Sequence, residues 1–124
     1  MEIACFDIDH QLPEQLQRIK PAVVINTCGP FQLKNYQTAQ ICIAHQTHYI
    51  DLADGLDYVS HINTLDQSAK AAGVSVISGA STVPALSSAV IEHLRPDFQT
   101  IESLKYGITP GQRSPRGLAT AQSV

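Results

Sequence analysis

The chain of 124 residues lacks several features that define large classes of protein. It has no run of about 20 apolar residues, so a membrane-spanning helix is not predicted. Its eight Lys and Arg residues are scattered and its net charge is -3, which argues against a nucleic-acid surface. No basic segment precedes an apolar one at the N-terminus, as in a secretory signal peptide. We therefore expect a cytoplasmic protein with no membrane and no nucleic acid among its partners.

Cysteine and histidine are too few and too dispersed for a disulfide framework or a metal site. The three cysteines are odd in number, and no pair of them has the spacing of metal ligands. Among the five histidines only His45 and His48 lie close in sequence, three positions apart. Zinc needs further ligands in a fixed geometry. The sequence therefore predicts reduced cysteines and no metal site.

A glycine-rich phosphate-binding turn is also missing, since Gly-x-Gly-x-x-Gly does not occur in the chain. What the chain does contain is a run of β-branched apolar residues, Val23 to Ile25, that stops abruptly at Asn-Thr-Cys-Gly-Pro. A buried parallel strand typically ends in this way where its carboxyl end meets a ligand crevice. The pattern indicates part of a nucleotide-binding enzyme without the turn that holds phosphate.

Short apolar runs alternate with helically spaced segments along the chain. We predict strands over 3–6, 22–25, 48–52 and 74–78. We predict helices over 12–19, 33–45, 56–72 and 84–94, with Ser81 or Thr82 as the cap of the last one. From residue 101 a period of two indicates a strand of a different sheet, and the tail from 109 to 124 reads as a loop. The alternation predicts an α/β fold with a parallel sheet.

Several segments together resemble saccharopine dehydrogenase-like oxidoreductases. They are VVINTCGPFQ at 23–32, HYIDLADG at 48–55, GVSVISGASTVPALSSAV at 73–90 and YGITPGQRSPRGLAT at 106–120. The resemblance implies that 1–98 is a partial Rossmann domain, a doubly wound parallel sheet without its first two strands. It implies that 99–124 begins an α+β substrate and dimerisation domain that stays incomplete.

The same resemblance implies a function for the intact parent protein. That protein would bind NADP or NAD and a small-molecule substrate, and would transfer hydride at a carbon–nitrogen or carbon–oxygen centre. It would also form a homodimer. Without the glycine-rich turn this chain alone is predicted to be inactive, so a catalytically silent structural or assembly role is the alternative.

By the resemblance, the cofactor-binding residues follow the strands. They are Asp7, Asn26, Thr27, Gly29, Pro30, Ser78, Gly79 and Ala80. Each group has a purely structural alternative: Asp9 as the cap of the helix that follows, 26–30 as a tight turn, and 78–82 as the start of a helix. Among Asp51, Asp54 and Asp57, Asp54 is the best candidate for proton transfer, although capping of the next helix is the commoner use of such residues.

The missing strands leave one edge of the predicted sheet open. In a doubly wound sheet the strand at 22–25 lies next to the first strand, which has no counterpart here. We expect that either the strand at 3–6 pairs with this edge or a second chain does, by dimerisation or swapping. An edge that stays bare in water would contradict both expectations.

Overall fold

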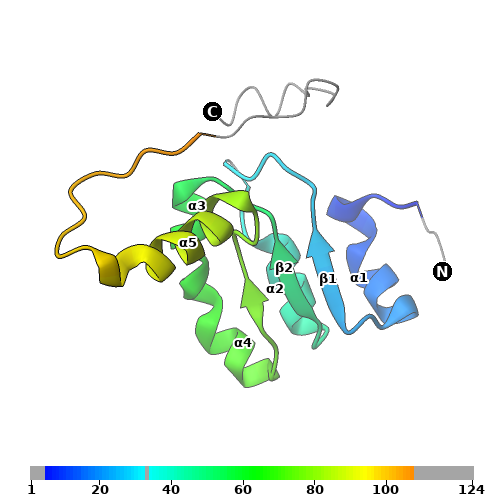
Figure 1. Cartoon of the computed structure of the whole chain (residues 1–124). Coiled ribbons are helices and arrows are strands. Elements are labelled where there is room, and N and C mark those ends of the chain that lie inside the picture. The colour runs from blue at the N-terminus through cyan, green and yellow to red at the C-terminus, as the bar shows by residue number, and fades with distance from the viewer. Residues whose placement is uncertain (1–4, 33, 108–124) are drawn as a thin grey trace.

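The computed structural model describes residues 5–32 and 34–107, and it shows a small parallel sheet with helices packed against it (Figure 1). The strands are β1 (Val23–Asn26), β2 (His48–Asp51) and β3 (Val76–Ile77), in the order β1-β2-β3. Both pairings are parallel; Ile25 lies opposite Ile50, and Ile50 lies opposite Ile77. The predicted mixed α/β arrangement with a parallel sheet is confirmed.

Three helices cover one face of this sheet. They are α1 (Ile8–Ile19), α2 (Gln37–Ala44) and α4 (Asp66–Ala72). Their apolar side chains surround Tyr49 of β2, which is fully buried. The buried members of this core are Leu12, Leu16, Ala39, Cys42, Ile43, Tyr49, Leu65 and Ala69.

Helix α1 begins four residues earlier than predicted because Asp7 caps it. The Asp7 carboxylate accepts a hydrogen bond from the backbone N–H of Asp9 at 2.9 Å, which satisfies one of the free donors of the first turn. Asp9, which the sequence predicts as the cap, lies inside the helix, so that prediction is wrong by two positions. Pro13 lies near the start of the helix, and Lys20 ends it in a left-handed conformation.

The single helix predicted over 56–72 is wrong: the segment is broken into three pieces. These are α3 (Leu56–Ser60), a 3-10 turn (Ile62–Leu65) and α4. The physical reason lies at His61, whose ring contacts the Asp57 carbonyl at 2.7 Å and whose own carbonyl accepts from the Thr64 hydroxyl at 2.8 Å. Side chains that bond to backbone carbonyls compete with the helical ladder.

The segment after β3 also differs from the prediction. A one-turn π-helix (Thr82–Leu86) comes first and α5 (Ser87–Leu94) follows, with a 3-10 turn at Arg95–Asp97. Ser81 occupies the N-cap position of the π-helix, as predicted, but makes no side-chain capping bond; its hydroxyl donates to the Val83 carbonyl, and Val83 itself is non-helical. The predicted helix over 84–94 is therefore confirmed only in its second part.

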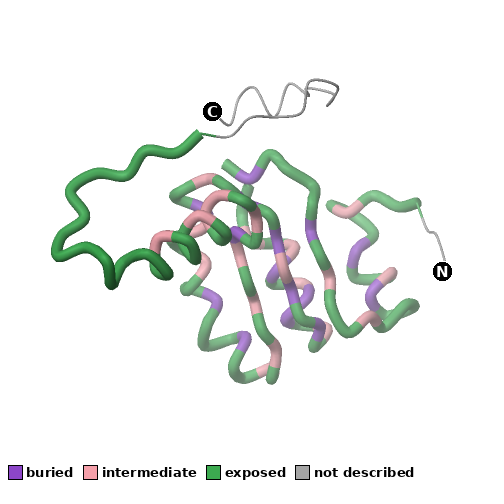
Figure 2. Tube along the Cα trace, viewed as in Figure 1, coloured by how far each residue is buried: buried purple, intermediate pink, exposed green. Residues whose placement is uncertain are grey.

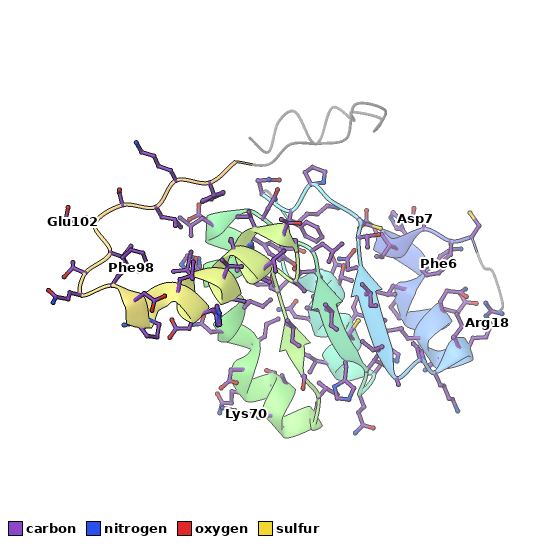
Figure 3. All side chains as sticks on the ribbon, viewed as in Figure 1. Phe6, Asp7, Arg18, Lys70, Phe98 and Glu102 are labelled. Atoms are coloured by element: carbon purple, nitrogen blue, oxygen red, sulfur yellow. The ribbon has the colours of Figure 1, made fainter. Side chains whose placement is uncertain are left out.

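Both ends of the described chain lack the strands predicted there. Cys5 and Phe6 precede α1 without joining the sheet, and residues 3 and 4 lie outside the described residues. Residues 101–107 form no strand, and the predicted tail over 109–124 lies outside the described residues. Figure 3 shows Phe98 and Glu102 on the segment that leads away from the sheet.

Among the described residues, no layer comparable to α1, α2 and α4 covers the second face of the sheet. The side chains of Ile25, Ile50 and Ile77 form one cross-strand row on this face, because their register pairs them directly. Ile25 is 60% exposed and Ile77 is 49% exposed. Figure 2 shows that burial is concentrated in the sheet and the helices behind it, whereas α5 and the following segment are mostly exposed. One side of a normally two-sided arrangement is thus open.

Candidate functional site

The three strands point the same way, so the loops that follow them meet at one end of the molecule (Figure 1). These loops are residues 27–30 after β1, 52–55 after β2 and 78–81 after β3. Ligands of open parallel sheets bind in the crevice at this end. All the residues assigned to cofactor binding by the resemblance, apart from Asp7, lie at these strand ends.

Asp51 ties two of these loops together. Its side chain is 0% exposed, and its Oδ1 accepts hydrogen bonds from the Ala53 N–H at 3.1 Å, the Ser78 hydroxyl at 2.7 Å and the Gly79 N–H at 3.0 Å. Its backbone carbonyl accepts from the Ala80 N–H at 2.9 Å. The carboxylate therefore sets the position of the loop after β3 relative to β2. Its Oδ2 is buried and has no hydrogen-bond partner among the described residues.

The buried side chain of Asn26 stabilises the turn after β1. Its Oδ1 accepts from the Cys28 N–H at 2.9 Å, and its Nδ2 donates to the Tyr49 hydroxyl at 3.0 Å. The residue is 7% exposed, and both polar atoms of its amide have partners within the chain. Holding the turn in this way is the role that the tight-turn alternative gives to Asn26.

An aromatic cluster supports the loops after β1 and β2 from inside. The rings of Tyr36 and Tyr58 lie 4.7 Å apart, those of Phe31 and Tyr58 lie 5.5 Å apart, and the Tyr36 hydroxyl donates to the Tyr58 carbonyl at 2.6 Å. Burial raises the pKa of Tyr49, of Tyr58 and of Tyr36. These hydroxyls therefore stay protonated near neutral pH and act as fixed hydrogen-bonding groups.

Asp54 lies on the surface and caps nothing. Its Oδ1 accepts from the Gln32 side-chain amide at 3.2 Å, and both groups are exposed. The N-cap of α3 is Gly55, with no side-chain capping bond, so the capping alternative for Asp54 is wrong. Asp54 is open to a ligand, and its one contact joins the loops after β1 and β2.

Asp7 lies at the start of α1, as Figure 3 shows. Its Oδ2 is 3.0 Å from Nδ1 of His10, and this hydrogen bond, helped by the Asp9 N–H, lowers the pKa of Asp7. Beside it, Asp9 lies 3.9 Å from the Lys34 ammonium and lines a cavity of about 30 Å³ together with Asn26 and Cys28. The helix start and the loop after β1 are therefore neighbours.

Several exposed positions of the loops after β1 and β3 carry small side chains. Thr27, Gly29, Pro30 and Ala80 are exposed. A Cβ added at Gly29 would meet only the Phe31 ring, at 3.6 Å, so nothing within the chain requires glycine there. At Gly79 the backbone φ is +77° and a Cβ would lie 2.9 Å from Pro84 Cγ, so this position does require glycine.

Several backbone donors of these loops are already in use. The N–H groups of Cys28, Gly29, Gly79, Ala80 and Ser81 each donate to an acceptor of the chain itself. A pyrophosphate needs free N–H groups, usually at a helix N-terminus after a glycine-rich turn. These five N–H groups already have acceptors within the chain, so they do not provide the free donors that a phosphate cradle needs.

We compared the chain with known proteins. No family model, no curated protein and no solved structure matches it. Within the part that the structure describes, no three His, Cys, Asp or Glu side chains gather as metal ligands would. No helix of the described residues has the length and apolar character that crossing a bilayer demands.

The residue that sequence reasoning undervalued is Asp51. It shares one face of β2 with Tyr49, two positions earlier, and both are 0% exposed. The period of two was present in the sequence and could have placed Asp51 on the covered face. Spacing along the chain alone does not separate Asp51 from Asp54, whereas the structure buries Asp51 and exposes Asp54.

Proposed function

We propose that this chain is part of a Rossmann-type dinucleotide-binding domain of an NAD(P)-dependent oxidoreductase in the saccharopine dehydrogenase-like group. In the intact parent the bound nicotinamide of NADP or NAD would exchange a hydride with a carbon–nitrogen or carbon–oxygen centre of a small-molecule substrate. The finer fold, a doubly wound sheet without its first two strands, is part of this proposal.

The observation that supports the proposal is the convergence of three loops at the carboxyl end of a parallel sheet. Asp51 joins two of them through hydrogen bonds to Ser78 and Gly79, and the Gln32–Asp54 contact joins the loops after β1 and β2. The result is a preorganised edge with small exposed residues, which leaves room for a flat ring. Residues of the chain itself would orient and shield the cofactor.

A second candidate is a catalytically silent structural or assembly role. Two observations favour it: the occupied N–H groups of the strand-end loops, and the uncovered row of Ile25, Ile50 and Ile77 on the sheet. In such a role the chain would provide a packing surface for a partner, and the groups that bind phosphate would belong to another polypeptide segment. The homodimer expected from the resemblance belongs to this candidate and stays a prediction.

Titration of the chain with NADP and NAD, followed by amide chemical shifts, separates the two candidates. Under the first, the amides of Thr27, Gly29 and Ala80 shift with saturation at micromolar to low millimolar nucleotide, while amides of α4 stay still. Under the second, no amide at the strand ends shifts.

A pair of matched variants makes the titration specific. Ala80→Asp puts a negative charge beside the strand ends and should abolish the shifts by repulsion. Ala71→Asp puts the same charge on another exposed alanine, near the end of α4 at the opposite end of the strands, and should leave the titration unchanged. Equal loss in both variants would contradict a site at the strand ends.

A further inference from the structure

The outer edge of β1 presents free strand-pairing groups. The His48 N–H donates to the Ala22 carbonyl at 3.0 Å, so Ala22, and by alternation Val24, directs its backbone groups toward β2. Val23 and Ile25 direct theirs the opposite way, where no strand of the described residues pairs with them. Such an edge is a template for another strand. The opposite edge, at β3, is only two residues long and offers much less.

A groove of about 300 Å³ runs beside this edge, between β1 and α1; we call it the α1–β1 groove. Leu12, Leu16 and Ile19 border it from the helix, and Val24 and Ile25 border it from the strand. None of the described residues that line it is charged. Natural edges that must stay unpaired usually carry charges, bulges or a cover. The described residues of this edge carry no charge, so the groove suits an equally uncharged, apolar occupant.

We propose that the α1–β1 groove accepts an extended apolar strand of a partner polypeptide. The strand would pair with Val23 and Ile25, about 4.8 Å from β1, and would pack one row of its side chains beneath α1. A helix or a small ligand could fill the groove, but neither satisfies a row of backbone donors and acceptors. The proposal deepens the assembly role proposed above and needs no dinucleotide.

A second copy of the chain fits the groove less well. Two-fold pairing of β1 with its counterpart keeps both α1 helices on the same face of the joined sheet. Because α1 borders the groove in which the counterpart strand would lie, each α1 would overlie the other copy's β1. The helix axes would then be separated by about one strand spacing, 4.8 Å, whereas packed helices need about 8–10 Å. A strand with no helix of its own on that face avoids this conflict.

The test uses the full chain, labelled with ¹⁵N, and the synthetic peptide Lys-Lys-Val-Ile-Val-Ala-Val-Lys-Lys. We expect the peptide to slow hydrogen exchange at the amides of Val23 and Ile25 at least tenfold. The same peptide with alternate backbone nitrogens methylated keeps its side chains and loses half of its donors, and should give no protection. Ile19→Lys charges the groove and should weaken binding at least tenfold. Leu94→Lys changes a residue of similar exposure, 44% against 47%, outside the groove, and should bind as the unchanged chain does.

Three outcomes would overturn the proposal. In the first, the peptide gives the amides of Val23 and Ile25 no protection up to millimolar concentration; in the second, the methylated peptide protects these amides equally well. Alternatively, the amides of Val23 and Ile25 become protected as the chain is concentrated without peptide, which would show that a second copy occupies the edge. NADP and NAD titrations of the same samples follow Thr27, Gly29 and Ala80, so failure of strand docking and failure of cofactor binding are told apart.

Discussion

A single buried carboxylate, Asp51, does more to organise the strand ends than the exposed residues around it. It is 0% exposed and accepts three hydrogen bonds on one oxygen. A buried acceptor that is removed leaves its donors unsatisfied, which costs more than the bond itself contributes. The loops after β2 and β3 therefore depend on it jointly.

Asp51→Ala should lower the free energy of unfolding by about 3 kcal/mol, because the N–H groups of Ala53 and Gly79 and the Ser78 hydroxyl lose their acceptor. Asp51→Asn keeps one side-chain carbonyl and should cost less. Urea unfolding measures both. Asp54→Ala is the matched control and should change stability by no more than about 0.5 kcal/mol. An Asp54 variant as damaging as Asp51→Ala would contradict the assignment.

Asp7 carries the pH dependence of the start of α1. Its hydrogen bonds to His10 and to the Asp9 N–H hold its pKa below the ordinary value of 3.8. A lowered folded-state pKa adds stability that is fully present above 3.8 and is lost as the pH falls through the folded value. Replacing His10 by Ala should raise the pKa of Asp7 toward 3.8, as followed by carboxyl NMR titration. His93→Ala, on α5, should leave it unchanged.

Elements that depend on the local sequence pattern could be predicted. Elements shaped by side-chain hydrogen bonds that compete with the backbone bonds of a helix could not. The β-branched run before Asn26 and the turn residues after it indicate β1 directly. Nothing in the spacing of 56–72 reveals that the side chains of His61 and Thr64 bond to backbone carbonyls and break the helix. Residues 101–107 alternate as a strand does, but an isolated run finds no partner strand in the described chain.

The turn from β3 into the following helix depends on Gly79. Gly79→Ala should lower the free energy of unfolding by more than 2 kcal/mol, since its φ is +77° and the new Cβ would lie 2.9 Å from Pro84 Cγ. Gly73→Ala is the matched control, with φ +70° and no atom within 4 Å. It should cost only the conformational strain, about 1 kcal/mol. If urea unfolding gave both variants the same loss of unfolding free energy, contact of the new Cβ with Pro84 would be unimportant.

Within the described residues, helices cover one face of the sheet and leave the other face exposed. The covered face buries Tyr49 under α1, α2 and α4. The fold class of the chain could be predicted because alternating strands and helices admit few arrangements. The site was harder to predict, because the difference between Asp51 and Asp54 lies in burial, which depends on packing of residues far apart in sequence.

Ile77→Lys should reduce self-association at high concentration, measured by sedimentation velocity, and leave the unfolding midpoint nearly unchanged. The reason is that Ile77 is 49% exposed on an apolar row, where a charge is solvated easily and breaks the patch. Val24→Lys is the contrasting variant: Val24 packs against the core on the other face and should unfold the chain. Unchanged association in Ile77→Lys would show that this face does not drive it.

The open row of Ile25, Ile50 and Ile77 also bears on how long the chain survives in a cell. Chaperones and proteases recognise apolar surface that should have been hidden, so an uncovered chain is held or degraded. Its steady-state abundance would then follow the supply of whatever covers that row, rising when the cover is co-produced and falling when it is scarce.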